Sequence, residues 1–196
     1  MNNQILPRLG AACGALFAVA LFAASGNSSH LYVVGLAAIV LFVPFLAYLW
    51  SVLREAEGPG GWLSTAALAA GLTGITIKLV SLAPEIANRH LSHGTPAHRA
   101  LQGIADAATV VSLYPLAVLL AAVAIVALRT GVLPRWLGFG AAATAIALAV
   151  NGSFIDADFV PALVLFLLWT LVASIVLFRR TRGDPAEVRA GATATT

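Results

Sequence analysis

Six apolar stretches, each set off from the next by charged or turn-forming residues, constrain this chain more than any other feature. A helix needs about 20 mostly apolar residues to cross a bilayer, so six windows take up about 120 residues of the 196 in the chain. Only 10% of its residues are charged, against about 25% in soluble domains. Too few polar groups remain to cover a soluble surface, and we expect an all-α integral membrane protein.

The spans are expected at residues 9–24, 31–53, 62–93, 96–129, 137–150 and 159–178. They predict one six-transmembrane-helix bundle over residues 1–182, followed by a disordered cytoplasmic tail over 183–196, which is small and polar. In the first span, Gly10 and Gly14 form a small-residue pattern that lets helices approach closely. An alternative for this span is a signal peptide cleaved after Ala23-Ala24-Ser25, which would leave five spans.

The basic residues set the orientation. With six spans, eight of them fall on the side of the termini: Arg8, Arg54, Arg129, Arg135, Arg179, Arg180, Arg182 and Arg189. Only Arg89 and Arg99 fall opposite, so the positive-inside rule places both termini in the cytoplasm. The high pI of about 9.6 is then explained by span ends that meet anionic lipid. We therefore expect the lipid bilayer, and no nucleic acid, as a partner.

The third and fourth spans are predicted to form a long helical hairpin. Gly94 is typical of a residue just past a helix end, Thr95 of an N-cap, and Pro96 of the first helical position. Both helices would exceed the length that the hydrocarbon requires. Counting from this turn in both directions places Glu85 level with about Asp106.

Polar residues follow one face of each hairpin helix. Spacings of three and four residues place Ser64, Ala67, Gly71, Gly74, Lys78, Ser81 and Glu85 on one face. The next helix offers Gln102, Asp106, Thr109 and Ser112, and the fifth span offers Thr144 and Asn151. Because buried polar groups need partners, we expect an outward-facing polar pocket lined by Lys78, Ser81, Gln102, Thr109 and Asn151.

Lys78 is the most informative of these residues. A lysine at the centre of a span costs about 2.5–3.5 kcal/mol. One interpretation is that Lys78 extends to the outer interface. Its side chain, however, leans toward the helix N-terminus, which here is the cytoplasmic end. The other interpretation, which we favour, is a lysine that faces the bundle and pairs with Asp106, Glu85 or Asn151.

All four histidines fall on the outer side, and three of them, His90, His93 and His98, suit a metal ion such as zinc. Their spacing matches no established motif, and the alternative is a set of solvated loop histidines. The single cysteine, Cys13, excludes a cysteine cluster. Glu85 and Asp106 are the candidate catalytic acid and base, although Glu85 could instead form a surface ion pair with Arg89.

The turn Leu133-Pro134-Arg135-Trp136-Leu137-Gly138, together with the earlier Tyr114-Pro115-Leu116-Ala117, resembles a family. It is similar to a group of small six-span bacterial membrane proteins, especially actinobacterial ones, classed as a domain of unknown function. The resemblance is best over the last three spans. It implies a six-helix bundle in a bacterial inner membrane, and it brings no catalytic residues with it.

Three classes of function remain open from the sequence. The first is an enzyme at the outer leaflet that uses Glu85, Asp106 and the histidines. The second is a transporter or sensor with Lys78 and an acid as an intramembrane pair, which would require a polar path into the cytoplasmic half. The third is an accessory subunit that packs against a membrane-protein partner or a second copy of the chain.

Overall fold

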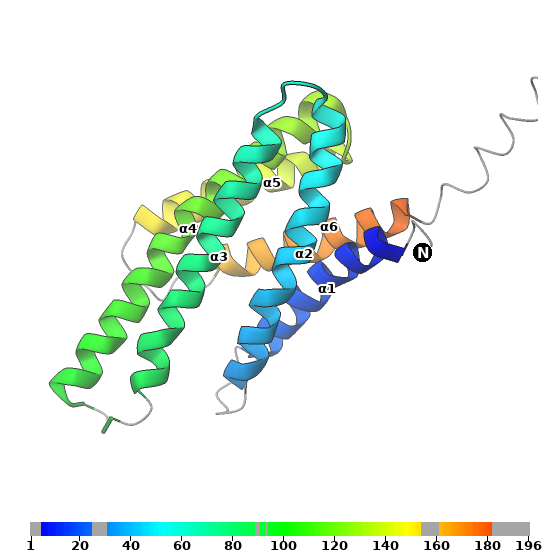
Figure 1. Cartoon of the computed structure of the whole chain (residues 1–196). Helices are drawn as coiled ribbons and strands as arrows, with labels where there is room; N and C mark the ends of the chain where they lie inside the picture. The colour runs from blue at the N-terminus through cyan, green and yellow to red at the C-terminus, as the bar shows by residue number, and fades with distance from the viewer. Residues whose placement is uncertain (1–4, 25–30, 89–90, 93, 154–160, 182–196) are drawn as a thin grey trace, which may run out of the picture. The chain divides into compact units, whose positions relative to one another are not determined.

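The computed structural model describes residues 5–24, 31–88, 91–92, 94–153 and 161–181. These residues form six α-helices, and every regular element among them is helical (Figure 1). The helices are α1 (Ile5–Ala24), α2 (Leu31–Glu57), α3 (Leu63–Asn88), α4 (Pro96–Thr130), α5 (Arg135–Ser153) and α6 (Pro161–Arg180). Each one is long and apolar enough to cross a membrane, which confirms the predicted fold class.

The predicted boundaries hold at both ends of α4 and differ at the ends of α2 and α3. Thr95 is the N-cap of α4 and accepts a hydrogen bond from the His98 backbone N–H, and Gly131 ends the helix with a φ of 68°. The helix α2 continues four residues past the expected end, to Glu57. The helix α3 ends at Asn88, before its predicted end at His93. Both His93 and the predicted tail over 183–196 lie outside the described residues.

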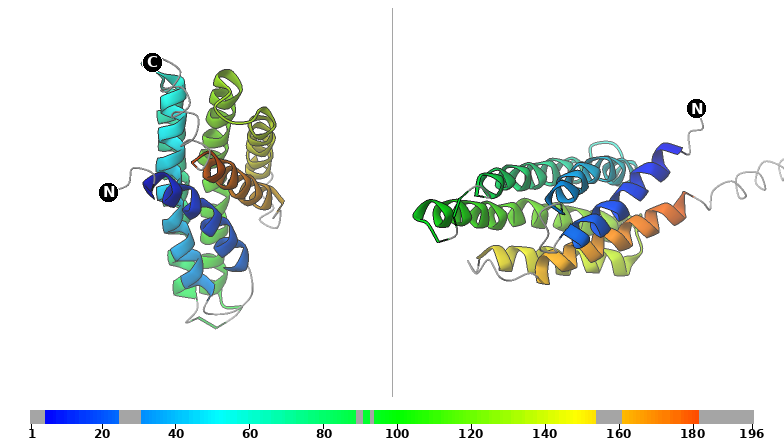
Figure 2. Two further views of the ribbon diagram at one scale, coloured as in Figure 1. Left: turned by 90° about the vertical axis from the view of Figure 1, so that its right-hand side faces the viewer. Right: turned by 90° about the horizontal axis from the view of Figure 1, so that it is seen from below.

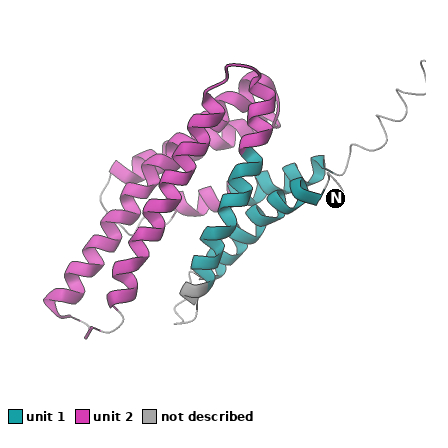
Figure 3. Cartoon of the chain, in the orientation of Figure 1, with its two compact units in different colours: residues 1–49, 170–196 teal, residues 50–169 magenta. Residues whose placement is uncertain are grey.

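The chain divides into two compact units (Figure 3). Unit 1 consists of residues 1–49 and 170–196, and unit 2 of residues 50–169. In unit 1, Phe17, Phe42 and Phe45 form a buried aromatic cluster. A Cβ on Gly14 would overlap the ring of Phe45, so the small-residue pattern of the first span permits the close approach of helices that it predicts.

In unit 2, α3 and α5 pack against α4 through small residues. A Cβ on Gly74 would lie 3.0 Å from Leu116 of α4. In α5, Gly138 faces Leu128 of α4, and Gly152 faces Tyr114. The predicted face of α3 is buried from Ser64 through Ala67, Gly71 and Gly74 to Ser81, which confirms it as the face that meets the bundle.

The helices of unit 2 differ greatly in length. The 35 residues of α4 extend about 52 Å, whereas the 19 residues of α5 extend about 28 Å, at 1.5 Å per residue. The contacts of Gly138 and Gly152 limit α5 to the part of α4 between Leu128 and Tyr114. The part of α4 before Tyr114 therefore continues with α3 past the end of α5, as two views show (Figures 1 and 2). We call this end of unit 2 the hairpin end.

At the opposite end of unit 2, a charged side chain caps the first turn of α3. The sequence analysis did not predict this cap. The carboxylate of Glu57, the last residue of α2, accepts hydrogen bonds from the backbone N–H groups of Leu63 (3.0 Å) and Ser64 (2.9 Å). Arg54 donates to the carbonyl oxygen of Gly61 in the same turn. Glu57 thus caps α3, where an anion is favoured by the helix dipole.

Candidate functional site

The register of the hairpin follows from two contacts between α3 and α4. The ammonium group of Lys78 donates to the Thr109 hydroxyl at 2.9 Å, and a Cβ on Gly74 would lie 3.4 Å from the Ser112 carbonyl oxygen. The helices are antiparallel, so the Lys78–Thr109 contact places Glu85 level with Gln102, whereas the contact of Gly74 with Leu116 places it level with Ala105. The expected level of Glu85 with about Asp106 stays a prediction.

Lys78 lies half-buried between the two helices, and its partner is a hydroxyl group. The Thr109 Oγ1 that accepts its hydrogen bond also donates to the carbonyl oxygen of Ala105 at 2.9 Å. The charges of Glu85 and Asp106 act on the ammonium group. In the described part of the chain, neither carboxylate forms a hydrogen bond or ion pair with it. Lys78 faces the bundle, as we expect, but its direct contact is uncharged.

Asp106 lies one turn from Thr109 toward the hairpin end. It is half-buried and accepts a hydrogen bond from the side-chain amide of Gln102 at 3.1 Å. Glu85 is exposed on α3. This arrangement confirms that Gln102, Asp106 and Thr109 share a face of α4. We call Lys78, Glu85, Gln102, Asp106 and Thr109 the hairpin site.

Two buried serines lie beside the hairpin site without contributing to it. The Ser81 hydroxyl donates to the Lys78 carbonyl oxygen at 2.7 Å, and the Ser112 hydroxyl donates to the Thr109 carbonyl oxygen at 2.6 Å. Both hydroxyl protons are therefore used by the serine's own helix. Ser81, predicted as a pocket residue, is buried and bonds to its own helix.

Asn151, the fifth predicted pocket residue, is buried in α5. It adjoins Gly152, which faces the ring of Tyr114, and Tyr114 lies five residues after Thr109 along α4. The Tyr114 hydroxyl is 3.4 Å from the Ser153 Oγ at the end of α5. The contact of α5 with Tyr114 is thus made by Gly152 and Ser153, and the Lys78–Thr109 bond joins α3 to α4.

The histidines are only partly described. His90 and His93 lie outside the described residues, and His98 is half-buried in the first turn of α4. Among the described residues, no three His, Cys, Asp or Glu side chains are placed to share a metal ion. Zinc binding by His90, His93 and His98 stays a prediction.

Asn88, which the sequence did not single out, is a buried polar residue near the hairpin end. Its side chain is 8% exposed, and its Oδ1 has no hydrogen-bond partner within the described ranges. It is the last residue of α3, whereas the helix expected from the sequence continues to His93.

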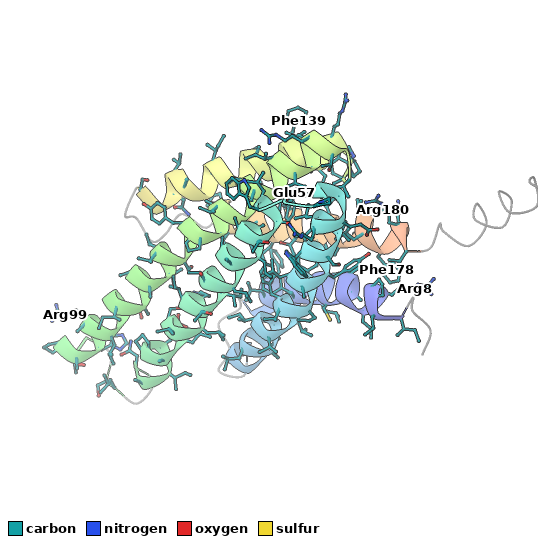
Figure 4. The ribbon with its side chains drawn as sticks, turned by 45° about the horizontal axis from the view of Figure 1, so that its top comes forward. Arg8, Glu57, Arg99, Phe139, Phe178 and Arg180 are labelled. Atoms are coloured by element: carbon teal, nitrogen blue, oxygen red, sulfur yellow. The ribbon has the colours of Figure 1, made fainter. Side chains whose placement is uncertain are left out.

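The hairpin site combines a cation held by a neutral group with two carboxylates that it does not touch. Figure 4 shows Arg99 on the projecting part of the hairpin and Glu57 toward the opposite end of unit 2. The site thus lies in the part of unit 2 that α5 does not accompany. No family model, curated protein or solved structure matches the chain.

Proposed function

We propose that the protein crosses a bacterial inner membrane six times, with both termini in the cytoplasm, and that the hairpin site binds a ligand at the outer surface. The distribution of basic residues supports this orientation. Arg54, Arg129 and Arg135 belong to the end of unit 2 that Glu57 closes, and Arg99 belongs to the hairpin end. The positive-inside rule assigns the first group to the cytoplasm.

Helix lengths support a position of the hairpin site near the outer boundary of the hydrocarbon. About 20 residues span the core, and counting that number back from Arg129 along α4 reaches Thr109. Lys78 lies 16 residues after Trp62, just before α3 begins, which corresponds to about 24 Å. Thr109 then lies at the boundary and Lys78 within about 6 Å of it, with Asp106 and Glu85 farther out.

The proposal depends on the hydrogen bond between Lys78 and Thr109. A buried charge that serves the fold is normally paired with an opposite charge, yet the direct partner of Lys78 is a hydroxyl. An ammonium group has three donors, and this one is fixed in orientation by Thr109. An anionic group that approaches from outside would find a cation already positioned for it.

The other functional classes receive less support from the geometry. Between Ser64 and Ser81, the buried residues of α3 are Ala67, Gly71, Gly74 and Ile75. The polar path that a transporter would require is therefore lacking along this face. For an enzyme, Glu85 and Asp106 would have to converge, but Glu85 is exposed whereas Asp106 is half-buried.

Cysteine accessibility tests this proposal in intact cells, in a Cys13→Ala background. A membrane-impermeant maleimide should label Ser92→Cys in the hairpin turn before lysis and Pro59→Cys in the opposite turn only after lysis. Lys78→Cys should be labelled from outside, because the hairpin site opens to water. Its matched control is Val80→Cys, two residues away and 65% exposed, which faces lipid and should not react.

Two results would contradict the proposal. Labelling of Pro59→Cys before lysis would reverse the orientation. Equal labelling of Lys78→Cys and Val80→Cys, or of neither, would remove the distinction between a water-connected site and the lipid-facing surface.

A further inference from the structure

The hairpin site has an internal order of charge along the membrane normal. Lys78 is the innermost charged group, at the level of Thr109. Asp106 lies three residues farther out on α4, a rise of about 4.5 Å, and Glu85 lies seven residues farther out on α3. A single positive charge thus lies inside two negative charges.

The net charge of this cluster selects against a simple anion. One ammonium and two carboxylates sum to a negative charge, so a phosphate or carboxylate alone would be attracted by Lys78 and repelled by Asp106. A ligand with an anionic group inside and a cationic group outside would satisfy both, because each charge would meet its opposite. The order of charges therefore requires a zwitterion with a defined orientation.

We infer that the hairpin site binds an aminophospholipid headgroup, with the phosphate on Lys78 and the primary ammonium group on Asp106. This inference rests on the proposed outward orientation. In such a lipid the phosphate lies nearer the acyl chains than the amine does, which is the order that the hairpin presents. The two-carbon link between phosphate and amine is short enough to follow one helical turn.

The depth proposed for Lys78, near the outer boundary of the hydrocarbon, suits a lipid rather than a soluble phosphate ester, because the phosphate of a lipid lies at that boundary. The Asp106 carboxylate is also oriented by Gln102, so it can accept a hydrogen bond from the amine without moving.

Lipid selectivity of the full-length protein tests this inference. The protein in detergent would be mixed with equal amounts of phosphatidylethanolamine, phosphatidylglycerol and phosphatidylcholine of identical acyl chains, and retained lipid would be counted by native mass spectrometry. We expect about tenfold more phosphatidylethanolamine than phosphatidylglycerol, the effect of one charge-assisted hydrogen bond. Phosphatidylcholine, whose ammonium group has no N–H to donate, should also be retained less.

Variants assign the preference to the two charges. Lys78→Met should abolish the retention of both phosphatidylethanolamine and phosphatidylglycerol, whereas Asp106→Asn should shift the preference toward phosphatidylglycerol. Arg99→Gln removes an exposed cation from the same helix and should leave the selectivity unchanged. Because the Asp106→Asn result is a change of preference, it stays decisive if Lys78→Met fails to fold.

Three outcomes would overturn the inference. Equal retention of the three lipids by the unsubstituted protein would show that the site does not recognise the primary amine. A preference for phosphatidylglycerol would show an anion site, and the proposed function would survive if Lys78→Cys is labelled from outside. Competition by soluble O-phosphoethanolamine as effective as that of the lipid would assign the site to a soluble ligand.

Discussion

The charged side chains at the two ends of unit 2 have different kinds of hydrogen-bond partner. At the end that we assign to the cytoplasm, both carboxylate oxygens of Glu57 accept backbone N–H groups of α3, and Arg54 donates to the Gly61 carbonyl oxygen. At the hairpin end, among the residues that the structure describes, Lys78 forms its hydrogen bond with the Thr109 hydroxyl and Asp106 with the Gln102 amide. Charges at the first end are matched by the backbone of a turn, whereas those at the second are matched by neutral side chains.

The kind of partner distinguishes a charged residue that stabilises the fold from one that is available to a ligand. A charge that satisfies the free N–H groups of a helix end contributes to stability, because those groups have no partner within the helix. A charge whose contacts are neutral contributes less to stability and keeps its electrostatic interaction for another molecule. If this comparison is right, removing the charge of Glu57 lowers the stability of the protein and removing the charge of Lys78 raises it.

The largest effect is expected from Glu57→Ala. Loss of a helix cap costs about 0.5–2 kcal/mol, and we expect a value near the upper limit because Glu57 accepts two backbone hydrogen bonds. Thermal unfolding in detergent would measure the loss. Glu55→Ala, two residues away on an exposed position, is the matched control, and an equal effect of both changes would break the comparison.

A smaller effect of opposite sign is expected from Lys78→Met. The variant should be more stable by about 1 kcal/mol, since a lysine near the end of a span costs less than the roughly 2.5–3.5 kcal/mol of a central one. Thr109 would keep its bond to the Ala105 carbonyl oxygen, so no polar group loses its only partner. The same unfolding measurement applies, and a clear loss of stability would make Lys78 a structural residue like Glu57.

The smallest effect is expected from Thr109→Val. It removes the acceptor of Lys78 but keeps the shape of the side chain, and one neutral hydrogen bond contributes about 0.5–1.5 kcal/mol. We expect a loss at the lower limit, because Lys78 can turn toward Asp106. Thr73→Val is the control, since the Thr73 hydroxyl is exposed and bonds only within its own helix. A loss as large as that of Glu57→Ala would contradict the comparison.

The sequence predicted the parts of the fold that depend on local chemistry. Hydropathy is sufficient for six helices, and the pair Thr95-Pro96 and the glycine at 131 mark the ends of α4 because capping depends on neighbouring residues. Spacing alone predicted the face of α3 that is buried. These features require no knowledge of which helix packs against which.

The site was harder to predict because its partners are set by the register between helices. Lys78 was expected to pair with Asp106, Glu85 or Asn151, and its direct partner is the Thr109 hydroxyl. Asn151 is buried in α5, and its place in the predicted pocket stays a prediction. The cap formed by Glu57 depends on the path of a glycine-rich turn, which hydropathy does not determine.

Because α4 and α5 differ in length, the hydration of Lys78 at its proposed depth depends on the thickness of the bilayer. The helix α5, about 28 Å long, matches a hydrocarbon core of about 30 Å and leaves little margin, whereas α4 continues past it. Because α5 is packed along α4, it fixes the height of the hairpin relative to the membrane. Bilayers differ in thickness by a few ångströms. A thicker leaflet would therefore submerge the lysine, and a thinner one would leave it hydrated.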